Sequence, residues 1–192
     1  MIAPLALALA LALAAAPAGL CASPVTPDAV CSPTEDPALR ERAAPLLDAI
    51  DRPASAEGWR RLPAGAREYL EAIAADPREY PSRRARALEG LAALGADAAI
   101  HERLASDPTT PFSVRHSAIR GVAALMAAEK AQRVLGGLMG ADADHRIRAT
   151  AAETLARAQP ASACAAVKAQ AARERSEVRP AFRRALAACG TR

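Results

Sequence analysis

A fourfold internal repeat constrains this chain more than any other feature of its sequence. Four nine-residue segments share an arginine in the second place, an alanine or phenylalanine in the fifth and an aliphatic residue in the ninth. The shared arginines, here called the arginine row, stand at offsets of 31, 33 and 31 residues and are Arg84, Arg115, Arg148 and Arg179. Places one, five and nine lie on one face of an α-helix, so each segment predicts a helix with an apolar stripe.

A second helical stretch precedes each segment, so each repeat is predicted to be a pair of helices. Asp76 and Asp107, each followed by proline, mark the turn between the helices of the first two pairs, and Ser82 and Ser113 are predicted N-caps. The first helices are predicted at 64–75, 96–106, 129–139 and 161–173, and the second helices at 82–95, 113–127, 145–158 and 177–189.

Such a pair cannot bury its apolar face alone, whereas stacked pairs share one continuous core. The predicted fold class is therefore all-α: an α-solenoid of about four helix hairpins over 63–192, preceded by a helical N-terminal cap over 37–62. Aromatic residues make up only 3% of the chain, and alanine and leucine dominate its apolar residues, a composition that suits helices. Trp59 of the cap is predicted to cover the core of the first repeat.

The repeat resembles a known family. A turn with aspartate, then Val-Arg or Ile-Arg and a small-residue helix that ends in an aliphatic residue, is similar to a HEAT repeat, as in 114–122 (VRHSAIRGV) and 147–155 (IRATAAETL). The chain looks closest to the bacterial type called the phycobilisome-lyase-like HEAT repeat, over about residues 64–189. It departs from the pattern at Arg83, which takes the aliphatic first place, and at Gly136 and Gly137. The resemblance implies a fold and says little about function.

The arginine row has two interpretations. One is an anion-binding row. The resemblance to HEAT repeats instead implies a structural row that bonds carboxylates in the turns, such as Asp107 and Asp142. We prefer the structural interpretation, because desolvated guanidinium–carboxylate pairs of this kind set the register between neighbouring repeats.

The fourth and seventh places of each segment point away from the apolar stripe. In a HEAT-like stack the second helices line the concave face, so these side chains are predicted to contact a partner; they are here called the predicted binding face. Its polar members are Arg86, Glu89, Ser117, Arg120, Thr150, Glu153 and Arg184, with Ala181 in the remaining place. Their mixed charge suits a protein surface or an extended peptide, whereas nucleic acid requires stacking aromatics and a continuous basic stripe. A plain solvated helix face is the alternative at each position.

The N-terminal end predicts export. Residues 1–22 contain an uncharged alanine–leucine run, which is typical of a signal peptide and short for a membrane span of roughly 20 residues. The mature chain is therefore predicted to be periplasmic or secreted and to have no membrane span. Lipid attachment at Cys21 is a second option, although Leu20 stands where a lipobox has a small residue, and an uncleaved anchor is a third. The Pro-rich stretch 23–36 predicts a linker.

The cysteines predict one disulfide. Cys164 lies near the start of one predicted helix and Cys189 near the end of the next, and these ends lie side by side in an antiparallel hairpin. We therefore predict a Cys164–Cys189 bridge, which export permits, with two buried thiols as the alternative. Cys31 is then unpaired unless Cys21 remains in the mature chain. No CxxC motif indicates a zinc ribbon or a thioredoxin-type site.

Motifs for catalysis are missing from the sequence. It contains no HExxH, no GxSxG and no phosphate-binding glycine loop. The histidines are His101, His116 and His145, and His101-Glu102 is the single His-Glu pair, whereas some HEAT-type enzymes bind iron through repeated pairs of this kind. We predict no enzymatic activity, no metal site and no cofactor.

The charge is concentrated at the C-terminal end. Residues 160–192 carry seven basic and two acidic side chains, while the whole chain has a net charge of +4. This end is either a solvated helix face or a surface for an acidic partner.

The predicted function is an exported scaffold or adaptor that binds a protein or peptide partner in the cell envelope. The alternatives are a small-ligand or lyase-like accessory protein, which requires a deep apolar pocket, and a nucleic-acid-binding protein, against which export argues.

Overall fold

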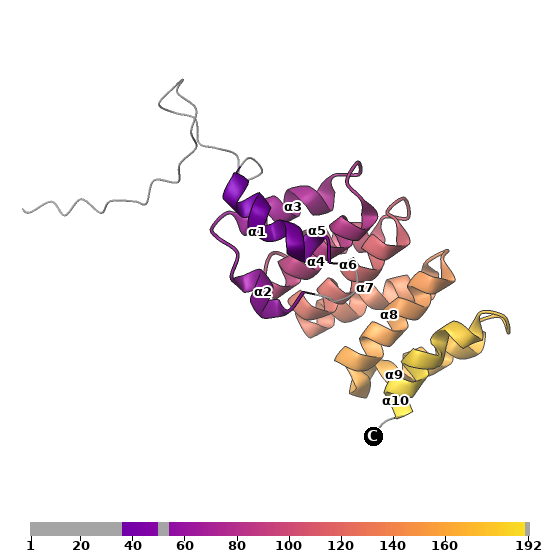
Figure 1. The fold of residues 1–192 in the computed structure, drawn as a ribbon. Coiled ribbons are helices and arrows are strands. Elements are labelled where there is room, and N and C mark those ends of the chain that lie inside the picture. Colours follow the sequence, from indigo (N-terminus) through magenta and orange to yellow (C-terminus); the bar gives the residue numbers. More distant parts are fainter. Residues whose placement is uncertain (1–35, 50–53, 191–192) are drawn as a thin grey trace, which may run out of the picture. The chain divides into compact units, whose positions relative to one another are not determined.

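The computed structural model of the protein describes residues 36–49 and 54–190, and over these residues the chain forms helices joined by short turns, without a strand (Figure 1). The prediction of an all-α fold is confirmed for this part of the chain. The predicted signal peptide over 1–22 lies outside the described residues, as do Cys21, Cys31 and all of the predicted linker except Asp36. The described residues all belong to one structural unit, Ser32–Arg192.

Ten α-helices and one 3₁₀ helix follow one another in the described residues. They are α1 Pro37–Leu47, α2 Ala56–Arg60, α3 Ala66–Ala75, α4 Pro81–Ala93, α5 Ala99–Ser106, α6 Phe112–Leu125, α7 Ala128–Ala141, α8 His145–Ala158, α9 Pro160–Arg173, the 3₁₀ helix η2 Arg179–Phe182 and α10 Arg183–Gly190.

Consecutive helices pack in pairs, and the second members of the pairs also contact one another. Helix α3 packs on α4, α5 on α6, and α7 on α8, while α9 packs on both α8 and α10. Helix α6 contacts α4 on one side and α8 on the other, and α10 extends this row by packing on α8 (Figure 1). The row α4, α6, α8 and α10 contains the first three repeated segments and the last four residues of the fourth.

The first turns of the second helices differ from the prediction. Ser82 and Ser113 are not N-caps, because each is the second residue of its helix. Pro81 starts α4, where its missing N–H costs nothing, and Pro111 holds the extended backbone before α6. Pro180 lies in η2, so the helix predicted at 177–189 divides into a 3₁₀ turn and α10.

The N-terminal helices α1 and α2 lie within the region predicted as a cap. Asp36, predicted to belong to the linker, is the N-cap of α1: its Oδ1 accepts hydrogen bonds from the backbone N–H groups of Ala38 (2.9 Å) and Leu39 (3.3 Å). Trp59 on α2 is fully buried and packs against Gly90 of α4. The indole therefore covers the core of the first repeat.

Gly90 of α4 and Gly121 of α6 let the rings of Trp59 and His101 approach the helix backbone closely. A Cβ added at Gly90 would lie 2.8 Å from atoms of both Trp59 and Leu70, and one added at Gly121 would lie 1.9 Å from Cδ2 of His101. His101 stands 31 residues after Leu70, so it takes the place of an aliphatic core residue in the next repeat. It is fully buried, with Nε2 3.0 Å from the carbonyl oxygen of Leu88.

Burial of His101 predicts a pH-dependent stability. Burial lowers the pKa of His101, whereas in the unfolded chain the imidazole titrates near its ordinary value of about 6.5. Below that pH the unfolded state binds a proton that the folded state excludes. We expect the free energy of unfolding to fall as the pH decreases from about 6.5 toward the lowered pKa of the folded protein, measured by urea denaturation. His101→Leu, which places here the residue type of Leu70, should have a shallower pH dependence, and an unchanged slope would contradict this explanation.

A disulfide closes the last pair of helices. It joins Cys164 of α9 to Cys189 of α10, as predicted, with the two Cα atoms 5.5 Å apart and a sequence separation of 25. The bond ties η2 and α10 to α9, where Phe182 and Ala185 are fully buried.

Removing this disulfide is expected to loosen the C-terminal end. The variant Cys164→Ser/Cys189→Ser should lose about 2–3 kcal/mol of unfolding free energy, because the bond restricts a long loop in the unfolded chain. Hydrogen exchange should quicken mainly in α9 and α10. As a control, the wild-type protein in reductant should have the same melting temperature as the double variant. A digest of the non-reduced protein that lacks the cross-linked peptide would contradict the pairing.

Candidate functional site

Members of the arginine row bind the C-terminal ends of the preceding helices. Nε of Arg84 donates to the carbonyl oxygen of Ala74 at 3.0 Å, and Nε of Arg115 donates to that of Ala105 at 2.9 Å. Both carbonyls lie in the last turn of a helix, where they have no partner within the helix. A guanidinium group there satisfies the carbonyl and complements the negative end of the helix dipole.

Two arginines of the row also reach the turn of the next repeat. Arg115 forms a bidentate ion pair with Asp142, in which Nη1 lies 3.3 Å from Oδ1 and Nη2 bonds Oδ2. Arg148 pairs in the same way with Glu174, with Nε–Oε1 and Nη2–Oε2 distances of 2.7 and 2.6 Å. The Arg148 side chain stabilises the ionised carboxylate and lowers the pKa of Glu174. These pairs link consecutive repeats.

In the part of the chain that the structure describes, Asp107 and Arg179 do not form the arginine–carboxylate pairs that the structural interpretation of the arginine row predicts. Asp107 does not hydrogen-bond an arginine within the described residues; its carboxylate accepts bonds from Thr109 and Thr110 instead, which closes the turn after α5. Arg179 is exposed, and its Nε donates to the carbonyl oxygen of Glu174 at 3.0 Å. The described residues beyond Arg179 contain no further turn between repeats that its side chain could reach.

The predicted binding face divides into two parts. On α4, Arg86 pairs with Glu89 (Nη1–Oε2 2.7 Å) and donates from Nη2 to the carbonyl oxygen of Ala49, so both charges serve contacts within the chain. Ser117 was predicted to be exposed, and this is wrong: it is 6% exposed. Helix α6 packs between α4 and α8, and this covers a wider arc of the helix than one apolar stripe.

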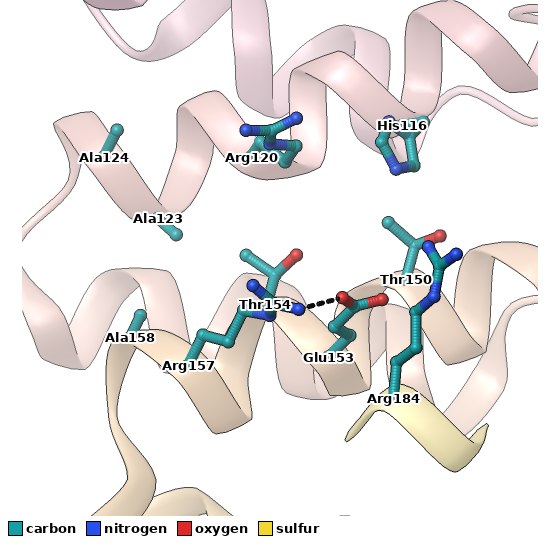
Figure 2. A pocket seen from close by; sticks show the side chains of 10 residues that line it. All are labelled: His116, Arg120, Ala123, Ala124, Thr150, Glu153, Thr154, Arg157, Ala158 and Arg184. Carbon is teal, nitrogen blue, oxygen red and sulfur yellow. Dashed lines mark ion pairs between the residues drawn. The ribbon is translucent and has the colours of Figure 1, made fainter. Parts of the chain in front are cut away.

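The remaining polar members come together around one cleft. Arg120 of α6, Thr150 and Glu153 of α8, and Arg184 of α10 line a hollow of about 500 Å³, here called the cleft (Figure 2). Figure 2 shows Arg184 extending from α10 toward Thr150. Four of the seven predicted polar residues are thus neighbours, although they derive from three different repeats.

The cleft has a polar end and an apolar end. His116 and Arg184 lie at the polar end, whereas Ala123, Ala124 and Ala158 lie together at the other (Figure 2). The three alanines present only methyl groups to the apolar end. The cleft is therefore amphipathic along its length.

Charge in the cleft is predominantly positive. Glu153 pairs with Arg157 (Oε1–Nη2 2.8 Å), which neutralises the acidic group of the cleft. Arg120 and Arg184 are exposed and form no ion pair with any of the described residues. The cleft thus carries two guanidinium groups whose charge is not balanced by a bonded carboxylate.

His116 is the histidine of the cleft, and these charges act on it. Burial and the nearby Arg120 lower the pKa of His116, Glu153 and Glu89 oppose this shift, and Arg184 adds to it. The ring also packs near Phe112, with centroids 6.0 Å apart. At neutral pH the imidazole is therefore mainly uncharged.

Sequence reasoning missed His116, Thr154, Arg157 and the three alanines of the cleft. Glu153 and Arg157 stand four residues apart on one helix, a spacing that indicates an ion pair. His116 stands in the third place of its segment, which the stripe analysis did not assign to the predicted binding face.

The described residues contain no group of three or more histidine, cysteine, aspartate or glutamate side chains that could hold a metal ion. Among the helices of this same part, none is long and apolar enough to cross a membrane.

Fold and site together define an all-helical protein with a basic, amphipathic cleft on a row of repeated helices. Comparison with protein-family models, with curated proteins and with solved structures gives no match for this chain. Its function must therefore be argued from its own residues.

Proposed function

We propose that this protein is an exported, non-catalytic scaffold of about four HEAT-like helix hairpins that binds a protein or peptide partner in the cell envelope. The binding surface is the face of α6, α8 and α10 around the cleft. One observation carries the proposal: Arg120, Thr150, Glu153 and Arg184 were selected by repeat position alone, and they line the same cleft.

The repeat supports the HEAT-like part of the proposal. The sequence offsets of 31, 33 and 31 residues coincide with successive helix pairs that pack in order along the chain. Arg115 and Arg148 each bond the turn of the next repeat, a contact that suits units stacked in one direction. These features favour a short solenoid.

The disulfide supports export. Bonds of this kind persist in oxidising compartments and are rare in the reducing cytosol. Together with the apolar run within residues 1–22, the Cys164–Cys189 bond favours a periplasmic or secreted protein.

Binding is preferred to catalysis because of the state of the groups in the cleft. Glu153, the carboxylate of the cleft, is already paired with Arg157, whose Nη2 lies 2.8 Å from its Oε1. The hydroxyl of Thr150 donates to the backbone carbonyl oxygen of Arg146 at 2.8 Å. The exposed guanidinium groups of Arg120 and Arg184 are suited to recognition of anionic groups.

A small-ligand function is the second candidate, favoured by the volume of the cleft. About 500 Å³ lies within the range of small-molecule sites. However, such sites are lined mainly by large apolar and aromatic side chains, and the apolar end of this cleft consists of alanines. A macromolecular partner fits this open, polar surface better.

Charge reversal in the cleft tests the proposal. We expect Arg120→Glu to abolish recovery of the main cross-linked partner when the tagged protein is isolated from its host and analysed by mass spectrometry. Glu153→Arg should reduce recovery less, because it removes a charge that is already paired. Arg133→Glu on α7 is the control, since it makes the same charge change at an exposed residue outside the cleft. A partner captured equally by Arg120→Glu and wild type would refute the proposed surface.

A further inference from the structure

We propose that the cleft binds a carboxylate group of the partner through Arg120 and Arg184, near His116, and that protonation of His116 strengthens this binding. The inference rests on the proposed function, because it takes the partner to be a protein or peptide. The carboxylate belongs either to an acidic side chain or to a chain terminus, since both present the same group.

The two arginines bring unpaired positive charge into one cleft. They come from different helices, α6 and α10, and line the same hollow without a bonded carboxylate in the described residues. A guanidinium group is planar and matches a carboxylate with two parallel N–H donors. Elsewhere in this chain the same pairing occurs internally, since Arg148 holds Glu174 by two bonds of 2.7 and 2.6 Å. In the cleft, Arg120 and Arg184 have no such carboxylate partner among the described residues, so a carboxylate of another molecule can pair with them.

The partner proposed for the cleft decides which anion is expected there. Unmodified proteins present carboxylates, at acidic side chains and at the chain terminus, and each carries one negative charge. A phosphate monoester, which carries nearly two charges at neutral pH, is the competing anion. Glu153 also lines the cleft, but its charge is paired with that of Arg157.

The apolar end restricts what accompanies the carboxylate. Ala123, Ala124 and Ala158 line the end of the cleft away from Arg184 (Figure 2). Small apolar side chains of the partner can bury surface against these methyl groups. We expect the bound segment to combine an acidic group with small neighbours such as alanine.

His116 couples this binding to pH. The charged groups facing it are Arg120 on its own helix, Glu89 on α4, Glu153 on α8 and Arg184 on α10. Positive neighbours and burial disfavour the imidazolium in the free cleft, and a bound carboxylate offsets both by supplying a negative partner. The bound state then has the higher pKa for His116, so affinity rises as the pH falls through that value.

The test is a pH titration of His116 by NMR in the disulfide-bonded protein, with His116→Gln used to assign its signals. The probes are a blocked alanine pentapeptide with a central glutamate, its glutamine counterpart, an alanine pentapeptide with a free C-terminus, and inorganic phosphate. We expect the glutamate peptide, the free-terminus peptide or both to raise the titration midpoint of His116, and the glutamine peptide to have no effect. Arg120→Gln and Arg184→Gln should each weaken that response about tenfold, and Arg133→Gln should not.

The outcomes separate this inference from the proposed function. A response to only one of the two carboxylate probes supports the inference and identifies the source of the group. Equal binding of the glutamate and glutamine peptides, tighter binding of phosphate, or no response of His116 would overturn it, even if Arg120→Glu still abolished capture of the partner. Capture that is indifferent to Arg120→Glu would instead refute the proposed function itself.

Discussion

Arg115→Ala is expected to lower the free energy of unfolding by about 3–5 kcal/mol, because removing one member of a buried ion pair leaves the other charge without compensation. The side chains of Arg115 and Asp142 are 4% and 10% exposed. The substitution also removes the 2.9 Å bond from Nε to the carbonyl oxygen of Ala105 at the end of α5. Urea denaturation monitored by circular dichroism measures the effect.

The matched control for Arg115→Ala is Arg61→Ala. Arg61 pairs with Glu57, but these side chains are 75% and 69% exposed. Such a surface pair contributes about 0–1 kcal/mol, so the control should melt close to the wild type. If Arg115→Ala left the melting temperature unchanged and instead abolished partner capture, the row would be an anion-binding surface, and the structural interpretation would be wrong.

The second large effect is expected at Gly121. Gly121→Ala should lower the free energy of unfolding by about 3 kcal/mol or more, at the upper end of the cost of overpacking a core. The added Cβ would lie 1.9 Å from Cδ2 and 2.4 Å from Nε2 of His101, and this fully buried ring cannot move aside without displacing its neighbours. The clash outweighs the gain in helix propensity of about 1 kcal/mol that alanine brings.

Two further variants isolate the contact between Gly121 and His101. Gly137→Ala in α7 makes the same chemical change where nothing lies within 4 Å of the new Cβ, and it should stabilise the protein by about 0.5–1 kcal/mol. His101→Ala should in turn make Gly121→Ala nearly harmless, because the ring that it strikes is gone. A large loss from Gly121→Ala in the His101→Ala background would show that the clash has been assigned to the wrong neighbour.

The helices and their pairing could be predicted because their signals are local. The predicted second helix at 145–158 coincides with α8, and the predicted first helix at 161–173 begins within one residue of α9. The errors lie at helix boundaries: the helices predicted at 82–95 and 113–127, for example, extend over 81–93 and 112–125. Ser82 and Ser113 are good N-cap residues, but a proline shortly before each one sets the backbone for the helix and moves its first residue upstream.

The candidate site could be predicted only in part. Arg120 and Ser117 were assigned to the same face from their places in the repeat, yet one is exposed and the other is buried. The difference arises from contacts on both sides of α6, which a single helical stripe does not describe. Arg86 illustrates a second difficulty: its partner, the carbonyl oxygen of Ala49, lies 37 residues away in sequence.

The sequence by itself determined the all-helical class, the order of helix pairs and the pairing of Cys164 with Cys189. These follow from apolar periodicity and short turns, which act over a few residues, and from the antiparallel course of two consecutive helices. Only the tertiary structure decided that Trp59 and His101 occupy the spaces above Gly90 and Gly121, and that Arg120 of α6, Arg184 of α10 and His116 of α6 line one cleft. These features depend on the distances and angles between helices, which are set by the volumes of side chains far apart in the sequence.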